Sequence, residues 1–417
     1  MKYLRLLLLG CCWLGTLEAA QAQGKLSGVV QDSVTHEPLA FASVFLANTT
    51  LGVTTTEQGR FEFPKVPAGT YDVVGSYVGY RLAKQAITVG PAPQQVTLQL
   101  APTGNQLGEV VVKPEPNKPE EYRKFSQLFL GGTTFSAQCH ISNPDDVRVS
   151  YDDSSGELTA QTKEFVQVDN DALGYRLKYY GLYFAHDDED QSITYYGQPV
   201  FEELTPRDEK QRQQWAANRL TAYRGSFMHF LRSVYRNRLQ ADGFLAQQVR
   251  VAPNPGFERA DSQRRALLES RPNGPFTAAE RDSLTRWGRM APVVATLNPA
   301  ARPIDSLRRV SADGKHTYLR FTGELQVCYF GEAPDPLYKR PMSTLGASRT
   351  PYPTKRQVSR LKLQGAEAEI QANGSLLNPL DVYNGEYWGF ERIGEFLPFD
   401  YVPPAAAPSA PSPSKRR

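Results

Sequence analysis

Short runs of alternating apolar and polar residues recur at intervals of about ten residues between positions 25 and 100, with glycine, proline and asparagine between them. Successive side chains of a strand point to opposite faces, so Phe61 and Phe63 share one face, as do Tyr71 and Val73. Strands are predicted at 26–31, 43–47, 52–56, 60–63, 70–77, 83–89 and 95–100. This pattern predicts a seven-stranded β-sandwich.

The same region contains segments that are typical of a known module. They are Gly28–Asp32, Glu37–Val44, Thr54–Phe63, Pro67–Tyr71 and Val78–Tyr80. Together they resemble the carboxypeptidase regulatory-like domain, and the resemblance implies a transthyretin-like sandwich that binds or spaces and does no chemistry. Leu107–Val112 resembles the segment that closes this module in TonB-dependent outer-membrane receptors. Only about 300 residues follow, with helical patterns among them, so no receptor barrel and no transport function is expected.

Alternating runs continue beyond this module, after a predicted short helix at 120–130. Strands are predicted at 147–151, 157–162, 165–169, 175–185, 191–196, 317–321, 323–330, 357–371 with a break, and 387–393. The polar turns 152–156 and 187–190 between them favour a meander and lack the ligand spacing of a calcium loop. We therefore expect the second region to be a β-rich α+β domain.

The strongest helical pattern covers 206–239, with Thr205 as the expected N-cap. Apolar residues at three- and four-residue spacing form one stripe, which should pack on the sheet. His229, Arg232 and Arg236 fall on the opposite side, so we expect them on a solvated outer face. The following stretch, 250–303, is predicted to be a connector with one helix at 277–290. Ala217–Arg232 and Gly243–Phe244 resemble segments of secreted Gram-negative proteins that join the same module to a shared C-terminal region without an established activity.

The N-terminus has the pattern of a secretory signal peptide. Lys2 and Arg5 precede an apolar run at 6–14, and Ala20-Gln21-Ala22 supplies small residues for cleavage before Gln23. The run is much shorter than the roughly 20 residues that span a bilayer. Leu8–Cys11 resembles a lipoprotein cleavage box, which makes a lipid anchor at Cys11 the lesser alternative. We expect an exported protein of the periplasm or the outer cell surface.

These signals divide the chain into five parts. Residues 1–22 are the signal peptide, 23–112 the β-sandwich, 113–119 a proline-rich linker, 120–402 the β-rich α+β domain and 403–417 a disordered tail. The formal net charge of +3 falls to +2 when the signal peptide is removed, so no basic field attracts nucleic acid.

The mature chain keeps two cysteines, Cys139 and Cys328. In an oxidising periplasm they could form one disulfide, or both could be buried thiols.

An enzyme hypothesis rests on one short match. His186 and Glu189 fit the His-x-x-Glu zinc element of carboxypeptidases, and His316 lies downstream as a possible third ligand. The match lies in an acidic turn, the chain has only five histidines, and in those enzymes the accessory module follows the catalytic domain. The sequence also lacks a Gly-x-Ser-x-Gly elbow, a phosphate loop and paired cysteines.

We therefore expect no catalytic residues, no metal and no cofactor. The chain is predicted to be a secreted, non-catalytic cell-envelope protein that binds an unknown envelope protein or glycan, or has a structural role. A hydrolase in the second region, such as a zinc carboxypeptidase, is the alternative. Tyrosine and tryptophan pairs at 179–180, 195–196 and 387–388 are the candidates for a sugar- or protein-binding face.

Overall fold

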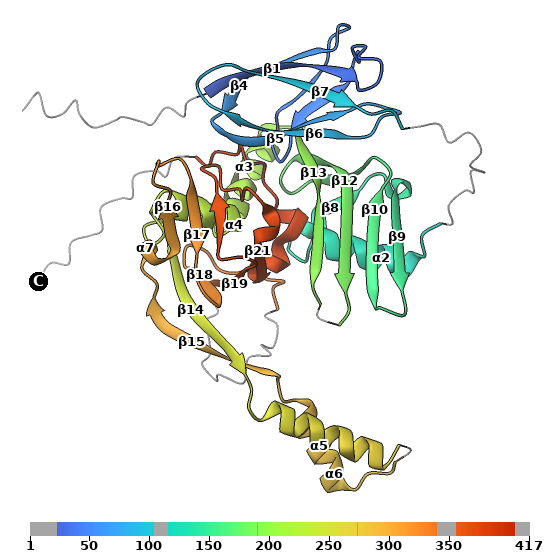
Figure 1. Cartoon of the computed structure of the whole chain (residues 1–417), viewed down its shortest axis with the longest axis vertical. Helices are drawn as coiled ribbons and strands as arrows, with labels where there is room; N and C mark the ends of the chain where they lie inside the picture. Colours follow the sequence, from blue (N-terminus) through green and yellow to red (C-terminus); the bar gives the residue numbers. More distant parts are fainter. Residues whose placement is uncertain (1–22, 104–115, 190, 273, 340–355, 405–417) are drawn as a thin grey trace, which may run out of the picture. The chain divides into compact units, whose positions relative to one another are not determined.

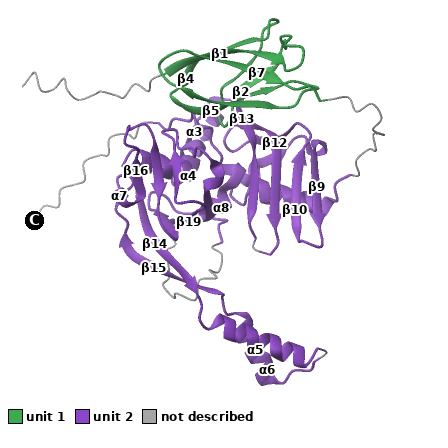
Figure 2. Ribbon diagram, viewed as in Figure 1, with its two compact units in different colours: residues 1–113 green, residues 114–417 purple. Residues whose placement is uncertain are grey.

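The computed structural model describes residues 23–103, 116–189, 191–272, 274–339 and 356–404. The chain divides into two compact units, residues 1–113 and 114–417 (Figure 2). The predicted signal peptide, the lipid anchor at Cys11 and the Leu107–Val112 segment lie outside the described residues. Residues 113–115 of the predicted linker and 405–417 of the predicted tail also lie outside them.

Unit 1 is a β-sandwich of one mixed sheet and one antiparallel sheet (Figure 1). Its strands are β1 (Gln23–Asp32), β2 (Ser43–Leu46), β3 (Gly52–Thr54), β4 (Arg60–Pro67), β5 (Gly69–Ser76), β6 (Ala83–Val89) and β7 (Gln94–Leu100). One sheet has the order β4-β1-β7 and the other β3-β2-β5-β6. Phe61 and Phe63 are both buried between the sheets, with ring centroids 5.9 Å apart. The predicted seven-stranded sandwich is confirmed.

One glycine of unit 1 shows why the chain reverses where it does. Gly59 precedes β4 with φ +69°, a conformation that L side chains rarely adopt. The backbone at Gly59 lies so close to Val30 that a Cβ at this position would be 2.6 Å from the Val30 carbonyl oxygen. The turn therefore requires glycine for both its dihedral angle and its space.

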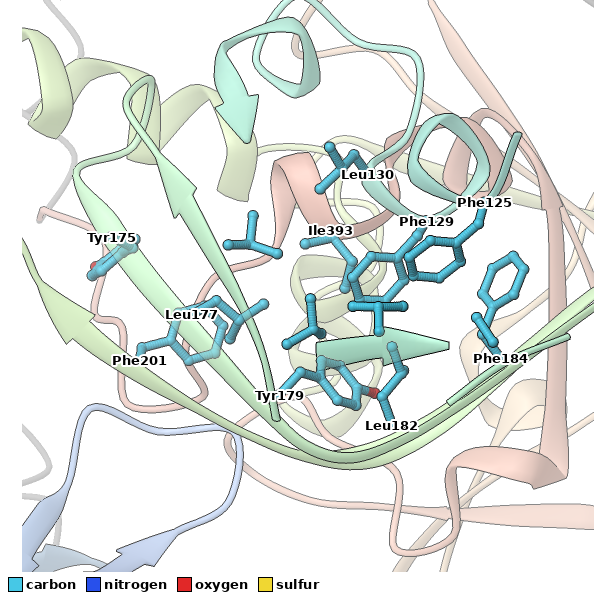
Figure 3. Packing of buried hydrophobic residues seen from close by; sticks show 14 of the residues in the cluster. Phe125, Phe129, Leu130, Tyr175, Leu177, Tyr179, Leu182, Phe184, Phe201 and Ile393 are labelled. Atoms are coloured by element: carbon cyan, nitrogen blue, oxygen red, sulfur yellow. The ribbon is translucent and has the colours of Figure 1, made fainter. Parts of the chain in front are cut away.

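Unit 2 begins with α2 (Pro119–Leu130), which packs on one face of a six-stranded antiparallel sheet. The strands are β8 (Cys139–Ile141), β9 (Val147–Asp152), β10 (Glu157–Thr162), β11 (Phe165–Asn170), β12 (Tyr175–Asp187) and β13 (Ile193–Glu203). The short 3₁₀ turns η2 (Ser136–Gln138) and η3 (Pro144–Asp146) flank β8. Phe125 and Phe129 of α2 contact Phe184 of β12, so the helix and the sheet share one apolar core (Figure 3).

A bulge in β12 keeps both halves of this long strand facing the same core. Tyr175, Leu177 and Tyr179 point inward, and after the register shift between Tyr180 and Tyr183 the inward residues are Leu182 and Phe184 (Figure 3). An extra residue in a strand reverses its alternation, and Gly181 with φ +57° supplies it. Without the bulge, Phe184 would face away from α2.

The rest of unit 2 contains two further sheets. Five strands, in the order β15-β14-β18-β19-β21, are β14 (Phe244–Pro253), β15 (Val293–Ala301), β18 (Glu324–Tyr329), β19 (Gln357–Leu363) and β21 (Val382–Glu386). The small sheet has β16 (Arg308–Val310), β17 (Thr317–Arg320) and β20 (Glu367–Ile370). The turns α7 (Ile304–Leu307) and η4 (Pro379–Asp381) connect their strands. The β-rich α+β class predicted for this region is confirmed.

The prediction of one continuous helix at 206–239 is wrong, because the structure has two helices there, α3 (Glu209–Tyr223) and α4 (Phe227–Tyr235). Asp208, rather than Thr205, caps α3, and Ser226 caps α4. The break is at Gly225, where φ is +79° and a Cβ would lie 1.9 Å from Gln357 Oε1. Tertiary packing therefore overrides a periodicity that continues across the break.

Two other segments differ from expectation. A strand was predicted at 387–393, but these residues form the short helix α8 (Tyr387–Glu391) and the start of the 3₁₀ helix η5 (Arg392–Glu395). The strand of this region is β21, which ends just before α8. The connector at 250–303 contains α5 (Phe257–Ser270) as well as the predicted helix, α6 (Ala278–Gly288), at the end of the β14–β15 ribbon (Figure 1). The sequence pattern did not predict α5, in which Ala260 is the one buried residue.

Candidate functional site

A polar groove lies on one face of the five-stranded sheet in unit 2. The register of β18, β19 and β21 places Glu324, Lys362 and Tyr383 in one cross-strand row. Arg360 and Gly385 lie side by side in the adjacent row. Directly paired residues point to the same side of a sheet, so these side chains share a face. With Ser192, Thr194, Leu361, Gln364 and Glu386 they line a groove of about 570 Å³.

Arg360 is the electrostatic centre of this groove. Its Nη1 lies 3.1 Å from Glu324 Oε2, and its Nε lies 3.4 Å from Glu386 Oε1. The three side chains are 15%, 25% and 17% exposed, so the ion pairs are only partly shielded from water. Two cationic and two anionic side chains line the groove when Lys362 is included. Their formal charges cancel.

Tyr383 and Gly385 shape one wall of the groove. The Tyr383 side chain is among the exposed large apolar groups, at 48% exposure. A Cβ at Gly385 would lie 3.5 Å from Tyr383 Cε1, so the ring lies over a position without a side chain. The groove therefore combines an accessible aromatic surface with charged and hydroxyl groups.

Glu386 holds an unusual backbone conformation beside this wall. Its φ is +59° and its ψ is −120°, a combination that is strained for a residue with a Cβ. The turn ends β21, starts α8 and leaves the carboxylate within 3.4 Å of Arg360. Strained residues of this kind concentrate at binding sites, where the surrounding structure holds them.

The structure does not bring the predicted zinc ligands together. His186 lies in β12 and is 3% exposed, with Nδ1 3.4 Å from Asp188 Oδ1, while Glu189 is exposed in the following turn. His316 lies beside the small sheet, where its Nδ1 is 2.8 Å from Glu369 Oε1. Within the described ranges, no group of three or more His, Cys, Asp or Glu side chains is placed to hold a metal ion.

Local contacts explain the chemistry of both histidines instead. Loss of hydration, together with the nearby Lys124 ammonium, lowers the pKa of His186. Lys124 Nζ donates to Asp188 Oδ1 at 2.7 Å, so the histidine and the lysine share this carboxylate. The hydrogen bond with Glu369 raises the pKa of His316. The two histidines therefore serve separate polar clusters.

His229 and Arg232 are not on a solvated face, and that prediction is wrong. Arg232 is 5% exposed, and its guanidinium donates to the carbonyl oxygens of Asn373, Phe399 and Tyr401 at 2.8, 3.1 and 3.0 Å. His229 Nδ1 accepts from the Gly225 N–H at 3.2 Å, and burial lowers the pKa of His229 to about 4. Of the three residues, Arg236 is exposed as expected.

The predicted aromatic pairs are mostly core. Tyr179, Tyr180, Tyr387 and Trp388 are all buried. Tyr196 is 52% exposed, and its ring stacks on Tyr183 with the ring centroids 5.0 Å apart. Tyr383 was not among the predicted binding residues. The alternation Val382-Tyr383-Asn384-Gly385-Glu386 could have indicated a strand with Tyr383 and Gly385 on one face.

A second cluster of carboxylates lies at the end of α8. Burial and repulsion by Glu395 raise the pKa of Glu391 well above its usual range, and burial raises the pKa of Glu395 to about 8. Asp335 and Glu332 are the other acids that contribute. Asp335 Oδ2 accepts from the N–H and the hydroxyl of Thr134 at 2.9 and 2.7 Å. Glu395 therefore keeps a proton at neutral pH.

The two cysteines lie in different sheets, Cys139 in β8 and Cys328 in β18, and no disulfide joins them. Burial raises the pKa of the Cys139 thiol to about 12, so it is not a thiolate at neutral pH. Of the two alternatives, a disulfide or two free thiols, the structure has two free thiols.

Comparison with known families identifies the N-terminal module. The model of the CarboxypepD_reg-like domain matches residues 26–112. Unit 1 therefore contains this domain, as the resemblance predicted. No curated protein matches the chain. No helix in the described parts of the chain has the length and apolar character needed to cross a membrane.

Solved structures with local similarity include pilus proteins and a putative carbohydrate binding protein. The shaft pilin SpaA from Lactobacillus rhamnosus GG is 16% identical, covering 20% of this chain and 47% of the pilin, with a TM-score of 0.17. The group B streptococcus pilus 2b backbone protein is 18% identical, covering 19% and 41%, with a TM-score of 0.17. A putative carbohydrate binding protein from Bacteroides uniformis is 10% identical, covering 43% of this chain and 99% of that one, with a TM-score of 0.16. The chain spans less than half the length of either pilus protein, and no functional argument follows from likenesses this weak.

Proposed function

We propose that this chain is an exported cell-envelope protein that binds an envelope ligand in the groove of unit 2 and does not catalyse a reaction. The CarboxypepD_reg-like domain would act as a spacer or as a second binding module. The observation that carries the proposal is the groove itself, where charged, hydroxyl and aromatic side chains converge from β13, β18, β19 and β21. Concave sites with a few convergent polar groups are the usual places for ligands.

The pairing inside the groove favours binding over catalysis. Glu324 and Glu386 both contact the guanidinium of Arg360, so each carboxylate already has a cationic partner. A general acid must instead hold a proton near neutral pH. The groove is therefore suited to recognition through fixed donors and acceptors.

Retention of envelope material by the immobilised full chain tests this proposal. The wild-type chain should retain a ligand from envelope fractions of the source organism, and Arg360→Met should lose it. Arg236→Met, which replaces an exposed arginine of the same unit, is the matched control and should retain the ligand. Equal retention by Arg360→Met and wild type would overturn the groove as the binding surface.

The hydrolase alternative now rests on a different site from the one the sequence suggested. Glu395, with its raised pKa, is the group suited to donate a proton, and groups of this kind concentrate at active sites. Glu395→Gln should then abolish any hydrolysis of envelope polymers by the wild-type chain. We favour binding because burial and contacts within the fold, with Thr133, Asp335 and Glu332, explain the pKa of Glu395 without a catalytic role.

A further inference from the structure

The groove of unit 2 also indicates what kind of ligand it takes. We infer that it binds a neutral, hydroxyl-rich glycan, with the Tyr383 ring as the surface on which a sugar ring lies. This inference rests on the proposed function and specifies its ligand. It follows from the charge balance of the groove, from the accessible ring and from the strands that supply the contacts.

The charge balance argues against an ionic ligand. Arg360 is paired with Glu324 and Glu386, and Lys362 lies directly opposite Glu324 in the register of β18 and β19. An anionic ligand would have to compete with both carboxylates for the guanidinium, and a cationic ligand would meet Arg360 and Lys362. A neutral ligand adds hydrogen bonds without separating these charges, because ionised groups make strong hydrogen bonds with hydroxyls.

Donors and acceptors are mixed in the way that hydroxyl groups require. A hydroxyl both donates and accepts, so a ligand rich in hydroxyls pairs with guanidinium and ammonium donors and with carboxylate acceptors at the same time. Glu324, Arg360 and Lys362 present both kinds within neighbouring positions of two strands. Thr194 at the start of β13 adds a group that serves in either role.

Tyr383 provides the apolar part of the site. Its ring is 48% exposed and lies over Gly385, where no side chain competes for the adjacent space. A sugar ring has an apolar C–H face, and a tyrosine offers an apolar ring with a polar end, so the two surfaces match. A polar groove without such a ring would not distinguish a sugar from other hydrogen-bonding ligands.

An extended peptide is the rival ligand. A peptide that joins a sheet does so through the main chain of an edge strand, and β21 is an edge strand of this sheet. The groove is instead lined by side chains that project from the face of β18, β19 and β21. Contacts from a face argue against a peptide that is added as a strand at the edge of β21.

Binding of defined oligosaccharides to the full chain tests the inference. The probes are neutral fragments of β-glucan, xylan, mannan and chitin, with acidic fragments of polygalacturonate and alginate for comparison, and titration calorimetry is the measurement. At least one neutral fragment should bind, and Tyr383→Ala should weaken that binding by at least tenfold. Gly385→Val should do the same, because its Cβ has room but its methyl groups would occupy the space beside the ring.

Phe330→Ala is the matched control, since Phe330 is as exposed as Tyr383 and follows β18 at the end opposite the groove residue Glu324. It should bind the neutral fragment like wild type, and all three variants should melt at the wild-type temperature. Preference for the acidic fragments, or wild-type affinity in folded Tyr383→Ala, would overturn the glycan inference.

The outcomes also separate this inference from the proposed function. If Arg360→Met loses the envelope ligand while no neutral fragment binds, the groove binds a ligand of another class, and the glycan inference is overturned while the proposed function stands. If Arg360→Met retains the envelope ligand, the groove is not the binding surface and both are overturned.

Discussion

Two arginines of unit 2 occupy contrasting environments. Arg232 of α4 is almost fully buried and donates to three main-chain carbonyl oxygens, contributed by Asn373, Phe399 and Tyr401. Arg360 of β19 contacts two carboxylates in a groove that is open to solvent. Main-chain carbonyls cannot turn away without moving the chain, whereas carboxylate side chains can rearrange around a ligand. The first arginine therefore belongs to the fold, and the second is suited to a site.

The largest expected effect comes from the buried arginine. Arg232→Met should lower the free energy of unfolding of unit 2 by roughly 3 to 5 kcal/mol, because three buried carbonyls lose a charged donor. Denaturant unfolding of the full chain, followed through the transition of unit 2, measures it. Arg236→Met, on the exposed side of the same helix end, should change it by less than about 0.5 kcal/mol. Similar effects of the two substitutions would remove the distinction between fold and surface.

The carboxylate cluster should produce the next largest effect, and it depends on pH. The folded-state pKa of Glu395 is about 8, above the ordinary value of 4.5, so the folded chain keeps a proton that the unfolded chain has lost. Stability should therefore fall as pH rises from 4.5 to 8. Glu395→Gln should remove this loss and be more stable than wild type at pH 8, by roughly 2 to 4 kcal/mol.

The two chains should have nearly equal stability below about pH 3.5, where Glu395 is protonated in both states. Glu258→Gln, at an exposed position of α5, is the control and should follow wild type at every pH. A Glu395→Gln chain that runs parallel to wild type across this range would contradict a raised pKa.

His229 should give a smaller effect of opposite slope. Its folded-state pKa is about 4, below the ordinary value of 6.5, because burial disfavours the charged ring. Between pH 6.5 and 4 the unfolded chain takes up a proton that the folded chain does not, so stability should fall as pH falls, by roughly 2 to 3 kcal/mol. NMR titration of the His229 ring measures the pKa directly, and a value near 6.5 would place the ring in solvent.

Replacing His229 by asparagine should remove this acid-side loss while keeping an acceptor for the Gly225 N–H. His316 is the comparison, because Glu369 raises its pKa and its contribution is lost as pH rises instead. The two histidines should therefore respond to pH in opposite directions.

The groove should give the smallest effect on stability. Arg360→Met removes two ion pairs between side chains that are 15 to 25% exposed, so its cost should lie between that of an exposed pair and that of a fully buried pair, at roughly 1 to 2 kcal/mol and below the loss expected for Arg232→Met. Thermal unfolding of the two variants in parallel measures the difference. An Arg360→Met chain that is as unstable as Arg232→Met would assign Arg360 to the fold.

Local pattern predicted the fold where each element forms from its own residues. The seven strands of unit 1, α2 and the strands from β9 to β12 follow the alternation that the sequence shows. The pattern failed where contacts with distant residues decide, as at Gly225, whose place beside Gln357 ends one helix and starts another. Likewise, the strained turn at Glu386 separates β21 from α8, although the apolar run continues into Tyr387 and Trp388.

The site was harder to predict than the fold for a related reason. Of the conspicuous side chains, His186 and Arg232 are buried, and His229 is half-buried and accepts a hydrogen bond from Gly225. The groove depends instead on the register that brings Glu324 opposite Lys362 and Lys362 opposite Tyr383. That register joins three strands that are distant in sequence, and no local motif records it.

Amide hydrogen exchange of the full chain, with and without the envelope ligand that the immobilised chain retains, tests the groove most directly. We predict that the ligand slows exchange in 357–363 and 382–386, the residues of β19 and β21, while 257–288 exchanges at its original rate. Protection confined to unit 1 or to 257–288, with β19 and β21 unchanged, would contradict the assignment of the groove as the ligand-binding surface.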